Sequence, residues 1–198
     1  MDILKHHGWW IVILLVLGAV LASGVNTLPT LDEKVKAAWS QVENQYQRRL
    51  DLVPNLVTVV KGYADFEQKT LTDVVNARAN ATKIVISADA INNPDEMKKF
   101  EQAQSALGTS LSRLLAVSER YPDLKANEQF LTLQAQLEGT ENRIAIARKD
   151  YIDAVQTYNT TARTFPGFVW ARIYGVSPKQ TFEAASGAEQ VPAVKFQN

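Results

Sequence analysis

Apolar residues recur at helical spacing along most of this 198-residue chain. After Pro29, steps of three and four residues form an apolar stripe that predicts one long helix, running from about Leu31 to the region of Ile84. Pro54 lies in the middle of this stripe. Because proline lacks the backbone donor and clashes with the preceding turn, we predict a kink or a short break there.

Two more long helices are predicted behind the first. Asn92-Asn93-Pro94 is a stop and restart signal, and an apolar repeat of nearly seven residues then runs from Met97 to Tyr121. Asp123 or Asn127 can cap the third helix, whose stripe runs from Phe130 to Tyr158.

Short pieces complete the chain. A break at Phe165-Pro166-Gly167 precedes a short amphipathic helix from Phe168 to Tyr174, which ends at Gly175. Ser177-Pro178 predicts one or two further helical turns, through Phe182. The segment from Ser186 onward is predicted to be irregular.

The fold class predicted from these patterns is all-α. Short loops imply antiparallel neighbours, so the long helices should form an elongated antiparallel bundle with knobs-into-holes packing and a short C-terminal helical cap, behind an N-terminal transmembrane helix. The predicted organisation is an N-terminal tail at 1–8, a transmembrane anchor at 9–25, a helical-bundle domain at 26–185 and a C-terminal tail at 186–198.

The anchor is predicted from the uncharged run WWIVILLVLGAVLA at 9–22. With the residues that follow, it offers roughly 15–18 apolar residues, or about 25 Å of helix, at the short end of a membrane span. Trp9 and Trp10 suit a membrane interface. A cleaved secretory signal, with Lys5 before the run and small residues after it, is an alternative, and a buried core helix is another.

The amino-acid composition excludes several classes of function and of binding site. Lys and Arg number 21, as do Asp and Glu, so the basic excess that nucleic acid would require is missing. There are no cysteines, which excludes disulfides, zinc-thiolate sites and a cysteine nucleophile. The only histidines are His6 and His7, and neither a GxSxG sequence nor a phosphate-binding glycine loop is present. We therefore predict no catalytic residue, no metal and no cofactor.

Charged residues interrupt the apolar stripes. Arg49, Glu67 and Arg78 lie on or beside the first stripe, and Glu141 and Arg148 on the third. Because an unpaired buried ion costs several kcal/mol, these charges should pair, either across helices to fix their register or with a partner protein. A di-metal carboxylate site of the helical-bundle type needs histidines that the main domain lacks.

Several long motifs resemble one family. They are AWSQVENQYQRRLDLVPNLVTVVKGYADFEQKTL at 38–71, VVNAR at 74–78, QLEGTENRIAIARKDYIDAVQTYNT at 136–160, and a closing FEA and VKF. In order and spacing they resemble the LemA family of bacterial membrane proteins. The resemblance implies an N-terminal anchor followed by a mostly helical bundle, and it implies no catalytic mechanism. It marks as candidate partner or assembly contacts Arg48, Arg49, Asp51, Pro54, Asn55, Glu67, Arg78, Glu141, Arg143 and Arg148.

The predicted function is that of a non-enzymatic scaffold or adaptor of the bacterial inner membrane. Basic residues flank the anchor almost evenly, but the signal-like layout favours a single pass with the bundle on the extracytoplasmic side. Self-association is expected because three helices would leave part of the broad first stripe uncovered. A membrane protein partner is a further expectation. The alternatives are an accessory subunit of a membrane protease or hydrolase, and a sensor of membrane state.

Overall fold

A computed structural model describes residues 2–63, 66–84 and 90–182, with residues 2–8, 21, 23 and 90 described by their backbone alone. Within these ranges the chain is helical and contains no strand, which confirms the all-α class. The elements in chain order are α1 (Asp2–Gly24), α2 (Thr27–Lys61), α3 (Gln68–Lys83), the 3-10 turn η1 (Ala90–Asn92), α4 (Pro94–Ser118), α5 (Pro122–Lys125), α6 (Glu128–Arg163) and α7 (Gly167–Tyr174).

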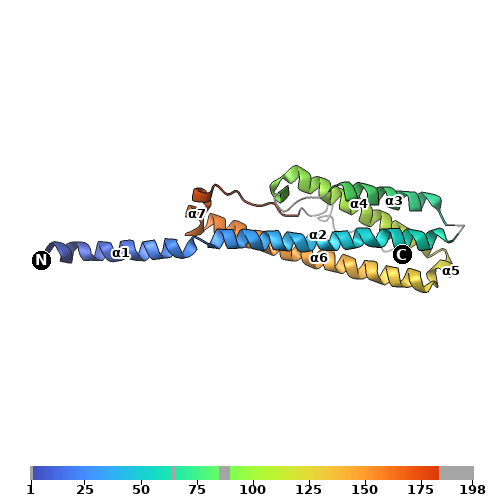
Figure 1. The fold of residues 1–198 in the computed structure, drawn as a ribbon, viewed down its shortest axis with the longest axis horizontal. Helices are drawn as coiled ribbons and strands as arrows, with labels where there is room; N and C mark the ends of the chain where they lie inside the picture. The colour runs from blue at the N-terminus through green and yellow to red at the C-terminus, as the bar shows by residue number, and fades with distance from the viewer. Residues whose placement is uncertain (1, 64–65, 85–89, 183–198) are drawn as a thin grey trace, which may run out of the picture.

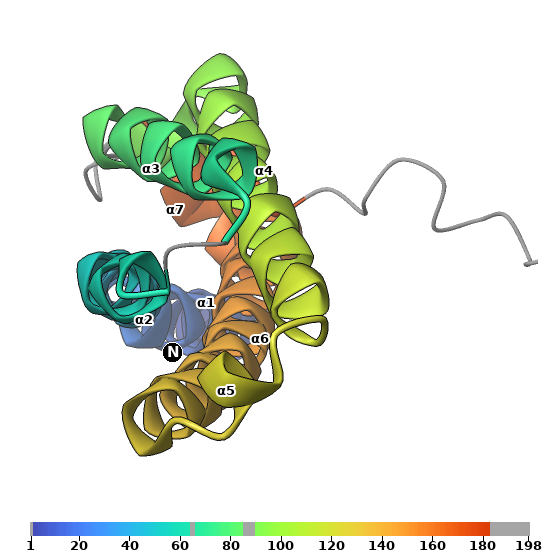
Figure 2. The same ribbon diagram turned by 90° about the vertical axis from the view of Figure 1, so that its right-hand side faces the viewer.

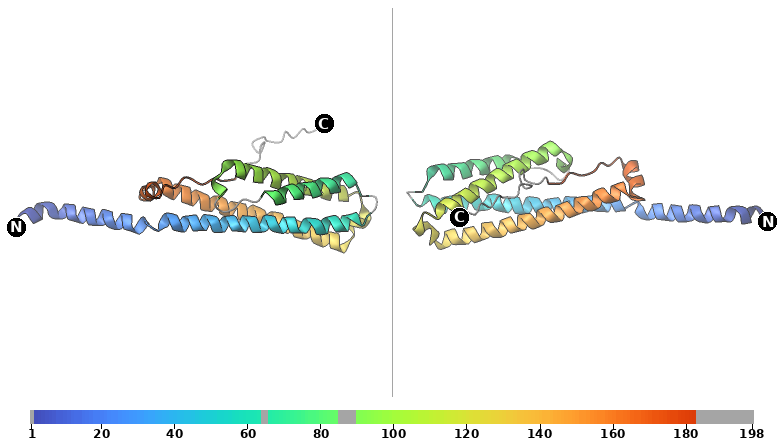
Figure 3. Two further views of the ribbon diagram at one scale, coloured as in Figure 1. Left: turned by 45° about the horizontal axis from the view of Figure 1, so that its top comes forward. Right: turned by 180° about the vertical axis from the view of Figure 1, so that it is seen from behind.

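The long helices form an elongated bundle. α2 and α6 pack along their lengths, and α3 and α4 form a second pair beside them (Figure 1, Figure 2). α1 leaves the bundle alone and continues roughly in line with α2, while α7 lies at the end from which α1 departs (Figure 1, Figure 3). The cap predicted at Asn127 is confirmed, since its side chain accepts a hydrogen bond from the backbone N–H of Phe130 in the first turn of α6. The side chain of Asn93 caps α4 in the same way, at the predicted restart.

The first predicted helix is wrong in its extent. α2 continues as a helix through Pro54 and ends at Lys61, so the short break, one of the two outcomes predicted there, does not occur. The chain instead reverses between the end of α2 and Gln68, where α3 begins as a separate helix. Phe66, just before α3, is buried and packs against Tyr121, with 4.9 Å between ring centroids, which fixes this part of the chain to the connection between α4 and α5. The apolar stripe continued past the turn because α3 also buries one face.

The core falls into two clusters. The proximal core, nearest α1, is built around Trp39, whose ring lies 5.2 Å from Tyr151 and 5.5 Å from Phe100. The distal core, toward α5, is mainly aliphatic, with Leu107 and Leu114 among its most buried residues, and also contains Phe66 and Phe130. Each large apolar side chain buried here contributes about 1.5–3 kcal/mol, so both clusters hold the bundle together.

The segment 175–182 corrects another prediction. Gly175 ends α7 at a φ of 64°, as its freedom from a Cβ allows, but no helical turns follow at Ser177-Pro178. The chain instead runs back along the bundle (Figure 1). The backbone N–H of Lys179 donates to Asn159 Oδ1 at 2.8 Å, and its carbonyl accepts from Asn159 Nδ2 at 3.0 Å. Because a side chain of α6 engages these backbone groups, they do not form helical bonds.

α1 is exposed along its described length, from Trp9 to Val20. Among the residues that the structure describes, no helix is both long enough and apolar enough to cross a membrane. The structure therefore does not support the transmembrane helix predicted at 9–25.

Candidate functional site

The centre of the candidate site is Arg49, whose side chain lies almost wholly inside the bundle. Its Nη1 donates to both carboxylate oxygens of Glu141, at 3.0 and 3.3 Å. Its Nη2 donates to Gln104 at the side-chain oxygen, 2.6 Å away, and at the backbone carbonyl, 3.0 Å away. One guanidinium thus joins α2, α4 and α6 at the level where the proximal and distal cores meet.

Arg49, Gln104 and Glu141 form a polar layer across the bundle, in which not every buried polar atom has a hydrogen-bond partner. Arg49 is 3% exposed, and its Nε has no hydrogen-bond partner among the described residues. The guanidinium carbon lies 5.0 Å from the centre of the Tyr46 ring, which offers a cation–π contact. Burial raises the pKa of Tyr46, so its phenol stays neutral near pH 7. A buried cation with several fixed partners disfavours any slip of one helix along another.

An open groove lies over the polar layer, between α4 and α6. Two adjoining hollows of about 440 and 490 Å³ share Gly108, Ser112 and Glu141 in their walls. A Cβ at Gly108 would lie 3.6 Å from Arg49 Nη1, an ordinary van der Waals distance, so Gly108 packs directly against the guanidinium. At the proximal end of the groove the Arg148 guanidinium lies 4.3 Å from the Phe182 ring centre. The groove therefore brings together Arg49, Glu141 and Arg148 of the predicted set.

The other predicted residues lie elsewhere. Arg78 Nε donates to the Leu50 carbonyl at 3.0 Å, one turn before Pro54. Glu67 pairs with Arg120 at 3.3 Å beside the α2–α3 reversal. The three remaining charged residues of the set are exposed on the outside of the bundle, namely Arg48, Asp51 and Arg143.

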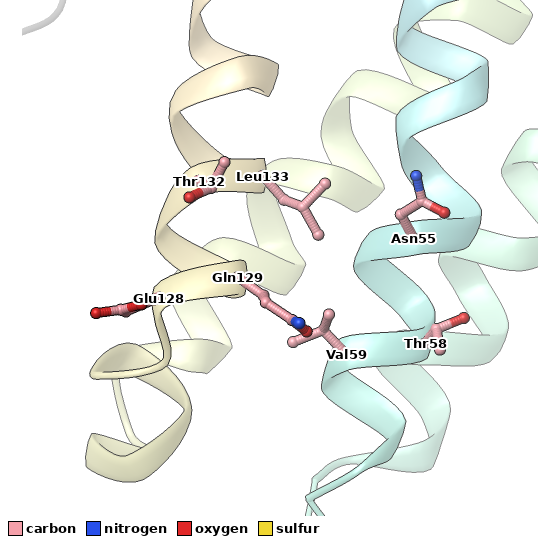
Figure 4. Close-up of a pocket in the computed structure, with 7 residues that line it drawn as sticks. All are labelled: Asn55, Thr58, Val59, Glu128, Gln129, Thr132 and Leu133. Atoms are coloured by element: carbon pink, nitrogen blue, oxygen red, sulfur yellow. The ribbon is translucent and has the colours of Figure 1, made fainter.

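Asn55 lines a separate hollow of about 510 Å³ between the end of α2 and the start of α6. Figure 4 shows Leu133 pointing from α6 toward α2, whereas Glu128 points away from the gap. The lining offers amide and hydroxyl groups but no carboxylate aimed into the space. This hollow can accept hydrogen-bonding side chains and has no arrangement for acid–base chemistry.

A second ionic cluster was not found from the sequence. Lys179 is 8% exposed, and its Nζ lies 2.5 Å from Asp32 Oδ1 and 4.9 Å from the Tyr158 ring centre. Burial alone would raise the pKa of Asp32, but the hydrogen bonds and positive charges of Lys179 and Lys36 outweigh it and lower that pKa. The pair fastens the segment 175–182 to α2.

Sequence reasoning missed these residues for different reasons. Gln104 carried a signal, since it is a polar residue on an apolar helical stripe. Lys179 carried none, because it lies outside any periodic segment. Across the part of the chain that the structure describes, no three acidic or histidine side chains gather to hold a metal ion. These charged residues hold helices together, and the groove between α4 and α6 is open to the surface of the bundle.

The range that carries the polar layer also identifies the family. The LemA family model matches residues 38–196, which include Arg49, Gln104 and Glu141. The chain belongs to the LemA family.

Two relatives of this LemA-family chain show how widely the sequence is shared. Magnetosome protein MamQ 2 of Paramagnetospirillum magneticum is 26% identical over 181 residues, which cover 83% of the chain and 66% of that relative. Protein LemA of Metamycoplasma hominis is 23% identical over 141 residues, which cover 71% of the chain and 60% of that protein. The chain thus spans slightly under two thirds of the curated relatives it matches.

Proposed function

We propose that this LemA-family chain is a membrane-anchored scaffold or adaptor without enzymatic activity, held in the bacterial inner membrane by α1. One observation carries the proposal. Every side chain from Trp9 to Leu17 is at least 42% exposed, and all of them are large and apolar. So continuous an apolar surface is unfavourable in water, and lipid would cover it. Trp9 and Trp10, whose rings lie 4.3 Å apart, suit the interface.

The bundle supports a mechanical role. α2 has 35 residues, and a helix of that length extends about 52 Å. Pairing with α6 along this length makes a rod that holds its distal end away from the attachment at α1. The charged residues that could have served chemistry bind one another or backbone groups across helices, as Arg49 and Arg78 do. The names of the relatives denote no reaction.

The extracytoplasmic placement of the bundle has a direct test. The chain has no cysteine, so Leu131→Cys, at an exposed distal position, creates a single thiol. Labelling of intact cells by a membrane-impermeant maleimide supports this orientation. Labelling that requires lysis contradicts it and places the bundle in the cytoplasm.

Self-association is part of the proposal, but the surface that would carry it differs from the expected one. The apolar face of α2 is buried within one chain, so it offers no contact to a second copy. Gly18 and Ala22 are exposed on α1 and are one turn apart, a spacing that lets two helices approach closely in lipid.

The mass of the full chain in mild detergent, measured by light scattering with detergent correction, tests self-association. We expect a discrete oligomer that Gly18→Leu reduces in size and that the matched variant Val12→Leu leaves unchanged. A monomeric wild-type chain contradicts self-association but not the anchor, and crosslinking to a different membrane protein would then be the next experiment.

A further inference from the structure

A second apolar surface lies outside the bundle core, on α7 and its flanks. Phe168 is 47% exposed and Ile173 is 63% exposed, although both are large apolar residues. Phe165 and Val176, just outside the helix, are exposed as well. Apart from α1, few large apolar side chains are so exposed, and only here do several lie close together in the described chain. Such a patch marks an interaction surface.

α7 is held at the point where α1 leaves the bundle. The Tyr174 hydroxyl donates to the Val25 carbonyl at 2.9 Å, between α1 and α2. A Cβ at Gly24 would lie 3.1 Å from Trp170 Nε1, so the last residue of α1 packs closely on α7. α7 is therefore fixed to the junction rather than to the distal bundle.

The direction of α7 distinguishes it from the other helices. Figure 1 and Figure 3 show α1 running along the long axis of the molecule, whereas α7 lies across that axis. A helix that enters a bilayer along the long axis would thus place α7 roughly parallel to the bilayer surface. Amphipathic helices that bind membrane interfaces take this orientation.

We propose that α7 is an interfacial helix, which inserts the side chains of Phe168 and Ile173 into the same lipid surface that α1 enters. This inference rests on the proposed membrane anchoring by α1. The composition of the surface agrees with it, because Trp170 and Tyr174 stack at 5.9 Å and such rings favour the headgroup level. Arg163 and Arg172 are exposed beside the apolar residues and can bind anionic headgroups.

Contacts of both α1 and α7 with lipid would fix the orientation of the bundle relative to the membrane. α1 alone would let the rod tilt about the short connection at 25–26. With α7 resting on the lipid surface as well, the rod stands away from the membrane in one orientation. The distal end is then presented at a fixed height, which is a requirement for a scaffold.

The test uses the full chain in proteoliposomes that contain anionic lipid. Because the chain has no cysteine, Phe168→Cys and Ile173→Cys each create one site for a nitroxide spin label. Collision with oxygen, which concentrates in lipid, is compared with collision with a water-soluble nickel chelate. Leu15→Cys serves as the reference within α1, and Leu131→Cys serves as the reference in water at the distal end.

We expect positions 168 and 173 to show an oxygen-to-nickel collision ratio several-fold above that of position 131 and below that of position 15. A ratio equal to that at position 131 overturns the proposal. Protection from both reagents also overturns it, because it indicates a protein contact. If the label at position 15 is in lipid while those at 168 and 173 are in water, the proposed contact of α7 is wrong but the proposed anchoring by α1 stands. If the label at position 15 is in water, the anchoring by α1 is wrong as well.

A charge variant gives a second reading that does not disturb the apolar side chains. Arg172→Glu should lower the oxygen-to-nickel ratio at position 168 in anionic vesicles and have little effect in vesicles of neutral lipid. Arg143→Glu, at an exposed arginine of α6, is the matched control and should change neither. An equal response to both variants contradicts a headgroup contact at Arg172.

Discussion

Arg78 Nε donates a 3.0 Å hydrogen bond to the backbone carbonyl of Leu50. In an uninterrupted helix this carbonyl would accept from the residue four positions later, but that residue is Pro54, which has no N–H. The side chain of α3 thus supplies the donor that proline removes from α2. Pro54 and Arg78 lie in different motifs of the sequence, at 38–71 and 74–78, yet both determine the hydrogen bonding of this one carbonyl oxygen.

This relationship predicts energetic coupling between Pro54 and Arg78. Arg78→Met should lower the free energy of unfolding by about 1–2 kcal/mol, because a partly buried carbonyl loses its donor. In a Pro54→Ala background the helix supplies its own N–H, so the same substitution should cost at least about 0.5 kcal/mol less. Denaturant unfolding of the four proteins, followed by circular dichroism, measures the difference. Additive effects would show that the carbonyl is not the link.

The polar layer makes a second prediction. Arg49→Met should destabilise the bundle by about 3 kcal/mol, since it leaves the buried Gln104 side chain and Glu141 without their cation. Glu141→Gln should cost less, about 1 kcal/mol, because an amide oxygen still accepts from the guanidinium and the site is open to water. Arg143→Met, at an exposed arginine, should change stability by no more than about 0.5 kcal/mol. Equal effects at Arg49 and Arg143 would contradict a structural role for the layer.

Attachment of the segment 175–182 should depend on pH through Asp32. Because the pKa of Asp32 is lowered in the folded chain, its pairing with Lys179 contributes stability above the ordinary value of 3.8 and loses it as pH falls through the lower folded value. A spin label at Gln180→Cys should therefore stay immobile at pH 3.8 and become mobile only at a lower pH, where Asp32 of the folded chain takes up a proton. With Asp32→Asn the label should already be mobile at pH 7 and respond little to acid. A label that stays immobile in that variant would assign the attachment to the remaining contacts, namely the hydrogen bonds of Asn159 and Tyr151 and the packing of Phe182.

Two glycines of the α6–α7 region should respond in opposite directions to alanine. A Cβ at Gly167 would overlap the backbone carbonyl oxygen of Thr161, so Gly167→Ala should destabilise the chain by about 2 kcal/mol or more. A Cβ at Gly139, within α6, meets only the flexible end of Arg143, at 3.4 Å. Gly139→Ala should therefore stabilise the helix by about 0.5–1 kcal/mol. Thermal unfolding of both variants gives the sign, and stabilisation at position 167 would contradict the close approach.

The sequence predicted the helices well where local signals agreed with packing. Asn93 and Pro94 carry both a cap and a helix-starting proline, and α4 begins there. The short break that was one of the two outcomes predicted at Pro54 does not occur, because the Leu50 carbonyl that proline leaves without a donor accepts from Arg78, 28 residues from Leu50. The reversal between α2 and α3 was missed, since the apolar spacing continues into α3 and Phe66 is buried against Tyr121, which is distant in the sequence.

The sequence indicated which charged residues would lie near the core, but not which residue each of them would bind. Arg49 and Glu141 lay on apolar stripes, so their pairing across helices was one of the two interpretations. The structure shows that pairing, while the use of any of these residues by a partner stays a prediction. The attachment of Lys179 could not be predicted, because it depends on Asn159 and Asp32 meeting a non-helical segment.

Whether α1 holds the chain in lipid is the central claim, and alkaline carbonate extraction of bacterial membranes tests it most directly. The wild-type chain should stay in the membrane pellet, as should Leu131→Arg, which changes an exposed residue of the bundle. The double variant Leu14→Arg, Leu17→Arg should move to the supernatant, because each charge near the centre of a membrane helix costs about 2.5–3.5 kcal/mol. Release of the wild-type chain by carbonate would contradict the account.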